Sequence, residues 1–186
     1  MRIVFIGPPG SGKGTQAVRL SQHLDVPHLS TGDMLRAARD EHTEIGNSVH
    51  DFLVSGRLVP DPVMLELIGG RLKEADCVGG CVLDGFPRTL AQAEALDEFL
   101  STHVGPLDVA IVLVVDEEEL VTRLAGRQRA DDQPDVIRRR LKVYKQQVDP
   151  IAEHYEEKGI LRNVDGIGTP DEVHQRIQVS LQGVER

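Results

Sequence analysis

The sequence predicts an α/β domain built on a parallel sheet flanked by helices. Short apolar runs, such as residues 3–6 and 109–115, alternate with longer segments whose apolar residues recur at helical spacing. This alternation is typical of parallel strands connected by helices. The first run leads into a glycine-rich loop, and a helical pattern follows at once. A length of 186 residues predicts one domain, and an apolar share of 40% is enough for a core.

Five short segments are expected to be strands, and the first, third and fourth of them are apolar runs. In chain order they are residues 3–6, 26–30, 81–84, 109–115 and 160–164. The fourth is the most β-like run in the sequence, and the third ends in an acid, Asp84. Ligands of parallel sheets bind at the carboxyl ends of the strands, so a site is expected in the loops that follow these runs.

Helices are expected around these strands. They are placed at about 13–24, from Ser30 onward, at 43–55, 62–75, 89–101, 116–126 and 135–157, and from Thr169 to Leu181. Ser30, Asp116 and Thr169 are suitable N-caps, and after the last two a glutamate three residues on indicates a capping box. Apolar residues at helical spacing mark the buried faces, for example Leu90 at the start of the 89–101 helix. Pro150 lies inside the longest helix and should kink it.

The composition argues against some classes of function. The formal net charge is −9, which disfavours a general nucleic-acid-binding or membrane-surface protein. The two cysteines, Cys77 and Cys81, have no further ligand at metal-site spacing, and no disulfide is expected between them. Neither a signal peptide nor a long apolar span is recognised, so a cytoplasmic protein is expected.

The loop from Gly7 to Thr15 is expected to cradle phosphate. It follows an apolar strand and opens a helix, and its glycines let backbone amides turn towards an anion. Lys13 adds a positive charge for phosphate oxygens, and Thr15 offers a hydroxyl. In the strict pattern a serine or threonine follows the lysine directly, whereas here Gly14 intervenes. An ordinary glycine-rich turn is the alternative, but strand, loop, lysine and helix all fall in the order that a phosphate site requires.

Asp84 is the candidate ligand of a metal ion. An acid at the end of the strand beside the cradle can hold Mg²⁺, usually through water, next to bound phosphates. A turn or helix-capping aspartate is the alternative reading.

Arginine is concentrated in one region of the chain. Six arginines stand within residues 123–140: Arg123, Arg127, Arg129, Arg138, Arg139 and Arg140. The planar guanidinium binds two phosphate oxygens at once. Nearby aspartates on a solvated helix face can pair with some of these arginines, but that pairing is a poor explanation for all six. Arg36 and Arg88 stand alone, and each follows a segment expected at the open edge of the sheet. None of the seven histidines is assigned to chemistry.

Four motifs together resemble adenylate kinase. They are Gly7–Thr15, Thr31–Arg36, Leu83–Arg88 and the arginines from Arg123 through Arg140, in the family's order over nearly the whole chain. The resemblance implies a P-loop NTPase-type five-stranded parallel sheet flanked by helices, with a small helical monophosphate-binding insertion and a short lid. It also implies Mg²⁺-dependent, reversible transfer between ATP and AMP to give two ADP.

The resemblance also implies the site residues. The phosphates of ATP would be held by Gly10, Ser11, Gly12, Lys13, Gly14 and Thr15, with Arg127 contacting ATP and Gly168 near its adenine. AMP would be held by Thr31, Arg36, Arg57, Leu58, Val59, Gly85, Phe86, Pro87, Arg88 and Gln92. The catalytic residues would be Lys13, Arg88, Arg123, Arg129 and Arg140, and the last two would reach phosphates of AMP or of the transfer centre. Asp84 would hold Mg²⁺ through water.

By the same resemblance the chain has three parts. The core comprises residues 1–29, 60–125 and 133–186, the AMP-binding subdomain is 30–59, and the lid is 126–132. Many family members carry a longer lid, sometimes with a four-ligand zinc site. The lid of this chain is short, so no structural zinc is expected here. The arginines must still close over ATP, because water would otherwise compete as acceptor, and a modest closure with Gly126 as hinge is expected.

A kinase for UMP or CMP is the nearest alternative. Thr31 and Gln92 favour adenine, since a hydroxyl and an amide can each donate and accept hydrogen bonds. A GTPase-type switch would carry an Asn-Lys-x-Asp base-reading motif, which the sequence lacks. A small-metabolite kinase that shares only the loop would not explain the motifs at 31–36 and 85–88. The expected partners are small nucleotides, with neither nucleic acid nor membrane, and a monomer is the default.

Overall fold

The computed structural model describes residues 1–41, 43, 46, 49, 52, 59–126 and 134–184. Within these ranges the side chains of residues 125, 134–140, 142, 143 and 145 are not described. The helix expected at 43–55 therefore lies almost entirely outside the described residues. Among those that are described, no helix combines the length and apolar character needed to cross a bilayer.

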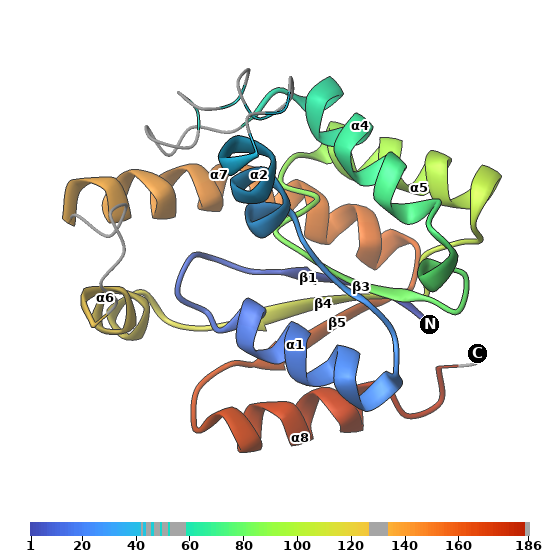
Figure 1. Ribbon diagram of the computed structural model, residues 1–186. Coiled ribbons are helices and arrows are strands. Elements are labelled where there is room, and N and C mark those ends of the chain that lie inside the picture. Colours follow the sequence, from blue (N-terminus) through green and yellow to red (C-terminus); the bar gives the residue numbers. More distant parts are fainter. Residues whose placement is uncertain are drawn as a thin grey trace.

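A five-stranded sheet forms the centre of the molecule, as predicted (Figure 1). Its strands are β1 (Arg2–Ile6), β2 (His28–Ser30), β3 (Cys81–Asp84), β4 (Val109–Val114) and β5 (Leu161–Asp165). They lie in the order β2-β3-β1-β4-β5, and every neighbouring pair is parallel. All five carboxyl ends therefore meet at one edge of the sheet, where the loops after β1, β3 and β5 come together.

Helices connect the strands and cover both faces of the sheet. They are α1 (Lys13–Leu24), α2 (Thr31–Asp40), α4 (Asp61–Leu72), α5 (Leu90–His103), α6 (Glu117–Ala125), α7 (Pro134–Glu157) and α8 (Pro170–Ser180), with a 3₁₀ turn, η1, at Ala75–Cys77. In Figure 1, α1 and α8 lie below the sheet, while α4, α5 and α7 lie above it. Pro150 is inside α7, as expected.

The two faces of β1 build separate cores. Val4 and Ile6 pack with residues of α4, α5 and α7, whereas Ile3 and Phe5 pack with residues of α1 and α8. All four side chains are buried. Successive strand residues point to opposite faces, so a strand covered on both sides must be apolar throughout. This requirement explains why residues 3–6 of β1 and 109–114 of β4 are uninterrupted apolar runs, whereas β2 and β5, at the two ends of the strand order, also contain polar residues.

The predicted N-caps are present. The Ser30 hydroxyl accepts a backbone hydrogen bond at the start of α2, and the Asp116 carboxylate accepts one from Glu119 N at 2.8 Å. At α8 the capping box is complete, because Thr169 and Glu172 each accept from the other's backbone amide. At α6 the capping box is incomplete among the described contacts. The Glu119 carboxylate accepts a hydrogen bond from Arg123 of the same helix instead of one from the backbone of Asp116.

One predicted core residue is wrong. Leu90 is 37% exposed, because it is the first residue of α5 and lies a turn before the buried stripe through Gln92, Ala93, Leu96 and Leu100. Helix α4 also carries a buried stripe along one side. Met64, Ile68 and Leu72 are buried at a spacing of four, while the neighbouring apolar residues are only half-buried.

Candidate active site

The loop between β1 and α1 has the backbone of an anion cradle. Gly10 and Gly12 have φ values of 86° and 95°, in a region that other residues rarely adopt. No side chain caps α1, so its first amides face the loop. The Ser11 hydroxyl is buried and has no hydrogen-bond partner within the described part of the chain. These groups suit a phosphate, whose oxygens accept hydrogen bonds from amides and hydroxyls.

Lys13 lies over this loop. Its Nζ atom donates to the carbonyl oxygens of Gly7 at 2.6 Å and Pro8 at 2.9 Å. These two carbonyl groups thus hold the ammonium group above the cradle. A phosphate that enters the loop can take over such hydrogen bonds and adds full charge attraction.

Asp84, at the end of β3, faces the start of α1. Its Oδ2 atom lies 3.3 Å from the position that a Cβ atom would take at Gly14, and 3.8 Å from His28 Nε2. Burial is the largest influence on the pKa of Asp84 and raises it, but the nearby His28, Lys13 and Arg88 together outweigh burial and lower the pKa. The carboxylate is therefore ionised at neutral pH. The departure from the strict loop pattern also has a physical reason, since Asp84 crowds the space that a hydroxyl side chain would need at Gly14.

This arrangement fits a Mg²⁺ ion that arrives with a nucleotide. Mg²⁺ keeps several waters and is bound through one or two carboxylates and substrate phosphates. One ionised carboxylate beside the cradle meets that requirement. Among the described residues, no three or more His, Cys, Asp or Glu side chains are grouped as ligands of a metal ion.

Three of the residues expected to bind AMP come together after β3. The buried Thr31 hydroxyl donates to the backbone oxygen of Asp84 at 3.3 Å, and Arg88 Nε donates to Gly85 O at 2.7 Å. Gly85 has a φ of 84°, and a Cβ atom there would lie 2.7 Å from Thr31 Oγ1 and 3.2 Å from a terminal nitrogen of Arg88. A narrow polar notch thus forms between α2 and the loop after β3. Phe86 follows it and is fully buried in the core.

The other residues on this side differ in their placement. Gln92 is buried in the first turn of α5, and Pro87 and Val59 are also buried. Arg36 is exposed and donates to Asp33 of its own helix at 2.5 Å, a bond that lowers the pKa of Asp33. The guanidinium of Arg36 is therefore held by α2, whereas that of Arg88 is held by the loop after β3.

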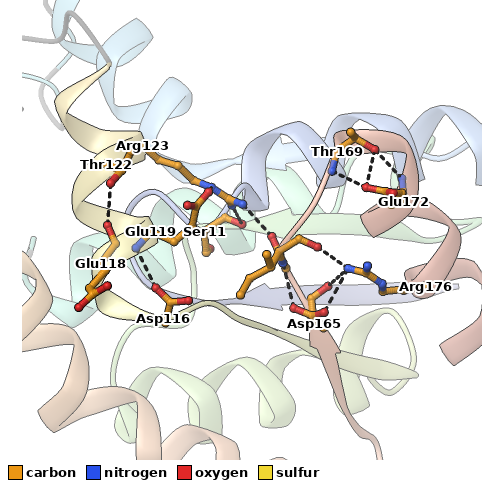
Figure 2. A network of polar contacts seen from close by, with 12 residues as sticks. Ser11, Asp116, Glu118, Glu119, Thr122, Arg123, Asp165, Thr169, Glu172 and Arg176 are labelled. Atoms are coloured by element: carbon orange, nitrogen blue, oxygen red, sulfur yellow. Dashed lines mark hydrogen bonds and ion pairs between the residues drawn. The ribbon is translucent and has the colours of Figure 1, made fainter.

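Arg123 joins the cradle to two other segments. Its Nε atom donates to Glu119 Oε1 at 2.7 Å, and its terminal nitrogens donate to Gly166 O at 3.1 Å and Ser11 O at 3.5 Å. Figure 2 shows the side chain reaching from α6 towards Ser11 and the loop after β5. A single guanidinium is thus positioned at the mouth of the phosphate loop by contacts from three segments.

The loop after β5 is held by α8. Arg176 donates to the backbone oxygens of Asp165 at 3.0 Å and Ile167 at 2.5 Å (Figure 2). Gly168 has a φ of 119°, and a Cβ atom there would lie 2.7 Å from Glu172 Oε2. Arg176 and Glu119 support the site but are not among the residues that the sequence predicts there. Glu119 had a local signal, because it stands four residues before Arg123, the spacing of helical ion pairs.

Five of the candidate residues, or their side chains, lie outside what the structure describes. Arg57, Leu58, Arg127 and Arg129 lie outside the described residues, and Arg140 is in α7 with a side chain that is not described. The described candidates nevertheless come from separate segments and gather along the carboxyl edge of the sheet.

Comparisons with known proteins agree with this geometry. The sequence model of the family described as adenylate kinase matches residues 5–160. A curated adenylate kinase of Kocuria rhizophila is 48% identical over 185 residues, covering 97% of this chain and 98% of the relative. Adenylate kinases of Stenotrophomonas maltophilia and Xanthomonas euvesicatoria are each 46% identical, covering 98% and 97% of this chain and 100% and 99% of the relatives. On both the family match and this near full-length identity, the chain belongs to the adenylate kinase family.

Proposed function

We propose that this chain catalyses the reversible transfer of a phosphoryl group from ATP to AMP, giving two ADP. The observation that carries the proposal is the convergence of Lys13, Asp84, Arg88 and Arg123 from four different segments at one edge of the sheet. Lys13 and Arg88 are both close enough to Asp84 to lower its pKa, and Arg123 contacts the loop that carries Lys13.

ATP binds with its phosphates in the loop from Gly10 to Thr15. The backbone amides and the Ser11 hydroxyl hold the phosphate oxygens, and Lys13 supplies charge at the outer phosphates. Gly168, in the loop that α8 holds, lies beside the adenine, and Arg127 contacts ATP. Because the loop glycines and Lys13 are already positioned before the nucleotide arrives, little ordering of this loop is needed on binding.

AMP binds in the notch between α2 and the loop after β3. Thr31, Gly85 and Gln92 face the nucleoside, while Arg36 and Arg88 neutralise its phosphate. Arg57, Leu58, Val59, Phe86 and Pro87 complete the walls. The backbone at Gly85 has to pass close to Thr31, so this position requires a residue without a side chain.

The transfer itself needs positive charge and alignment rather than a base. The attacking oxygen belongs to a phosphate and is already anionic, so no proton has to be removed. Arg123, together with Arg129 and Arg140, stabilises the charge of the moving phosphoryl group, and Arg88 aligns the acceptor. Arginine suits this task because its fork binds two phosphate oxygens at once.

Asp84 would hold Mg²⁺ through water beside the ATP phosphates, and the ion would neutralise phosphate charge there. The low pKa of Asp84 supports this role, because the carboxylate is ionised at the pH of the reaction. Zinc has no part in the proposal.

The three parts implied by the sequence belong to the same proposal. Residues 30–59 bind AMP, residues 126–132 form a short lid, and the remainder is the core. The relatives reported above are adenylate kinases, which supports AMP over UMP or CMP as acceptor.

The test is a coupled assay of ADP formation with ATP and Mg²⁺ as donor and four acceptors in turn: AMP, GMP, UMP and CMP. AMP should give by far the highest kcat/KM. Faster turnover of UMP or CMP would replace the proposal by the alternative kinase, and no turnover with any of the four would reject it. Light scattering after size-exclusion chromatography tests the expected monomer in the same preparation.

A further inference from the structure

The side-chain amide of Gln92 is held from both ends. Its Oε1 atom accepts from the backbone N–H of Arg88 at 2.7 Å, and its Nε2 atom donates to Asp61 Oδ1 at 2.6 Å. Gln92 is only 2% exposed, so neither end can exchange these partners for bulk water. Asp61 is the first residue of α4, 31 positions earlier in the chain.

These two partners fix which end of the amide is oxygen and which is nitrogen. The N–H of Arg88 can only donate, and the Oδ1 atom of Asp61 accepts. If the amide were reversed, its NH₂ group would face the N–H donor and its oxygen would face the carboxylate. Both contacts would then be repulsive, and buried polar groups would be left unsatisfied.

Each end of the amide still has one unused site. A carbonyl oxygen can accept two hydrogen bonds and an NH₂ group can donate two, and the residues that the structure describes take one of each. What remains is one acceptor beside one donor, in an order that Arg88 and Asp61 set. Adenine presents an amine donor at position 6 next to the acceptor N1, which complements this order. Hypoxanthine and guanine present an oxygen at position 6 next to an N1–H donor, which is the reverse order.

We propose that Asp61 is a positioning residue that sets the base specificity of the acceptor site. It acts through Gln92 by holding the amide in the orientation that adenine requires. The inference rests on the proposed function, in which Gln92 faces the AMP base. A second contact supports it, because the Thr89 hydroxyl lies 3.4 Å from Asp61 Oδ2 and accepts from Gln92 N at 3.1 Å.

A purely structural role for Asp61 would be to join α4 to α5. Such a role predicts lower stability on substitution but no change in the choice between bases. The positioning role predicts a change in that choice. The ratio of kcat/KM for AMP to that for IMP therefore separates the two, because IMP differs from AMP at positions 6 and 1 of the base and nowhere else.

The test is Asp61→Asn, which keeps the shape and removes the obligatory acceptor. The AMP-to-IMP ratio should fall at least about tenfold, since a hydrogen bond to a charged group no longer opposes reversal of the amide. KM for AMP should rise while KM for ATP stays within about twofold. Asp61→Glu retains the carboxylate, so its ratio should lie between those of the wild type and the Asn variant.

The matched control is Asp76→Asn. Asp76 forms a two-pronged ion pair with Arg71, near the other end of α4, with distances of 2.6 and 2.7 Å. This variant should lose some stability in urea unfolding and keep the wild-type ratio. The positioning role is overturned if folded Asp61→Asn keeps its AMP-to-IMP ratio within twofold, or if Asp61→Glu lowers the ratio more than Asp61→Asn does. Failure of the wild type to phosphorylate AMP would instead reject the proposed function.

Discussion

The carboxylate of Asp84 lies 3.3 Å from the point where a Cβ atom at Gly14 would stand. The end of β3 and the first turn of α1 therefore approach so closely that a residue with a side chain fits there only if the carboxylate moves. The carboxylate also lies within reach of the charge on Lys13. The glycine-rich loop and the carboxylate that we propose as the Mg²⁺ ligand are thus in direct proximity.

We predict that Asp84→Asn lowers kcat by at least about 100-fold, because the variant loses the charge that positions Mg²⁺ at the transferred phosphate. The measurement is steady-state ADP formation at saturating ATP and AMP. Asp108→Asn is the control, since Asp108 is half-buried at the opposite edge of the sheet and accepts from Arg2 N at 2.5 Å. It should retain kcat within about twofold, and an equal loss in both variants would count against the assignment of Asp84.

The pKa of Asp84 also predicts how stability depends on pH. The folded-state pKa lies below the ordinary value of 3.8, so ionisation of Asp84 favours the folded state above pH 3.8. That contribution is lost as the pH falls through the folded-state pKa. Urea unfolding of wild type and Asp84→Asn at pH 7 and pH 3 should therefore show the wild type losing more stability on acidification. Parallel curves for the two proteins would contradict this.

Gly85→Ala should damage the acceptor site. Its positive φ strains any other residue, and the new Cβ would lie 2.7 Å from Thr31 Oγ1. We expect the variant to lose about 1–3 kcal/mol of unfolding free energy and KM for AMP to rise more than KM for ATP. Gly70→Ala in α4 is the control, because a Cβ there meets nothing within 4 Å. It should gain roughly 0.5–1 kcal/mol, and the prediction fails if the two substitutions have the same sign.

Much of this architecture could be predicted because it is local in the sequence. Asp84, the acid that ends β3, and Gly85 after it could be predicted as site residues because they directly follow an apolar run. The capping box of Thr169 and Glu172 lies within four residues, and it marks the start of α8 directly. The glycine-rich loop could be predicted for the same reason, since its strand, glycines, Lys13 and helix are consecutive in the sequence.

The rest depends on contacts between distant residues. Arg123 reaches Ser11 and Gly166, which are 112 and 43 positions away, and no local pattern announces either partner. Asp61 and Gln92 meet only because α4 packs beside α5. The exposure of Leu90 also depends on distant residues. Helical spacing predicts which side of α5 is buried, but it does not predict how far along the helix other elements cover that side.

The two cysteines should be unreactive in the folded protein. Burial is the largest influence on both thiols and raises the pKa of Cys77 to about 11 and that of Cys81 to about 12. Little thiolate, the reactive form, is then present at pH 8. We expect a disulfide reagent such as dithiobis(nitrobenzoate) to label neither thiol in the native protein within minutes and both in urea. Rapid labelling of native protein would show that one of the thiols is accessible.

Arg88→Ala should lower turnover by orders of magnitude while the protein stays folded. The side chain is exposed, and its Nε atom donates to Gly85 O, so its removal leaves no cavity in the core. In the proposed site it makes a desolvated contact to phosphate, and such contacts are worth about 3–4 kcal/mol in the transition state.

Arg162→Ala is the matched control, because Arg162 also donates to backbone carbonyls, those of Gly159 and Leu161, but at the opposite edge of the sheet. Initial rates of ADP formation measure the turnover of both variants, and urea unfolding measures their stability. A loss of less than about tenfold for Arg88→Ala would mean that this arginine supports the loop after β3 and does not act on the phosphate.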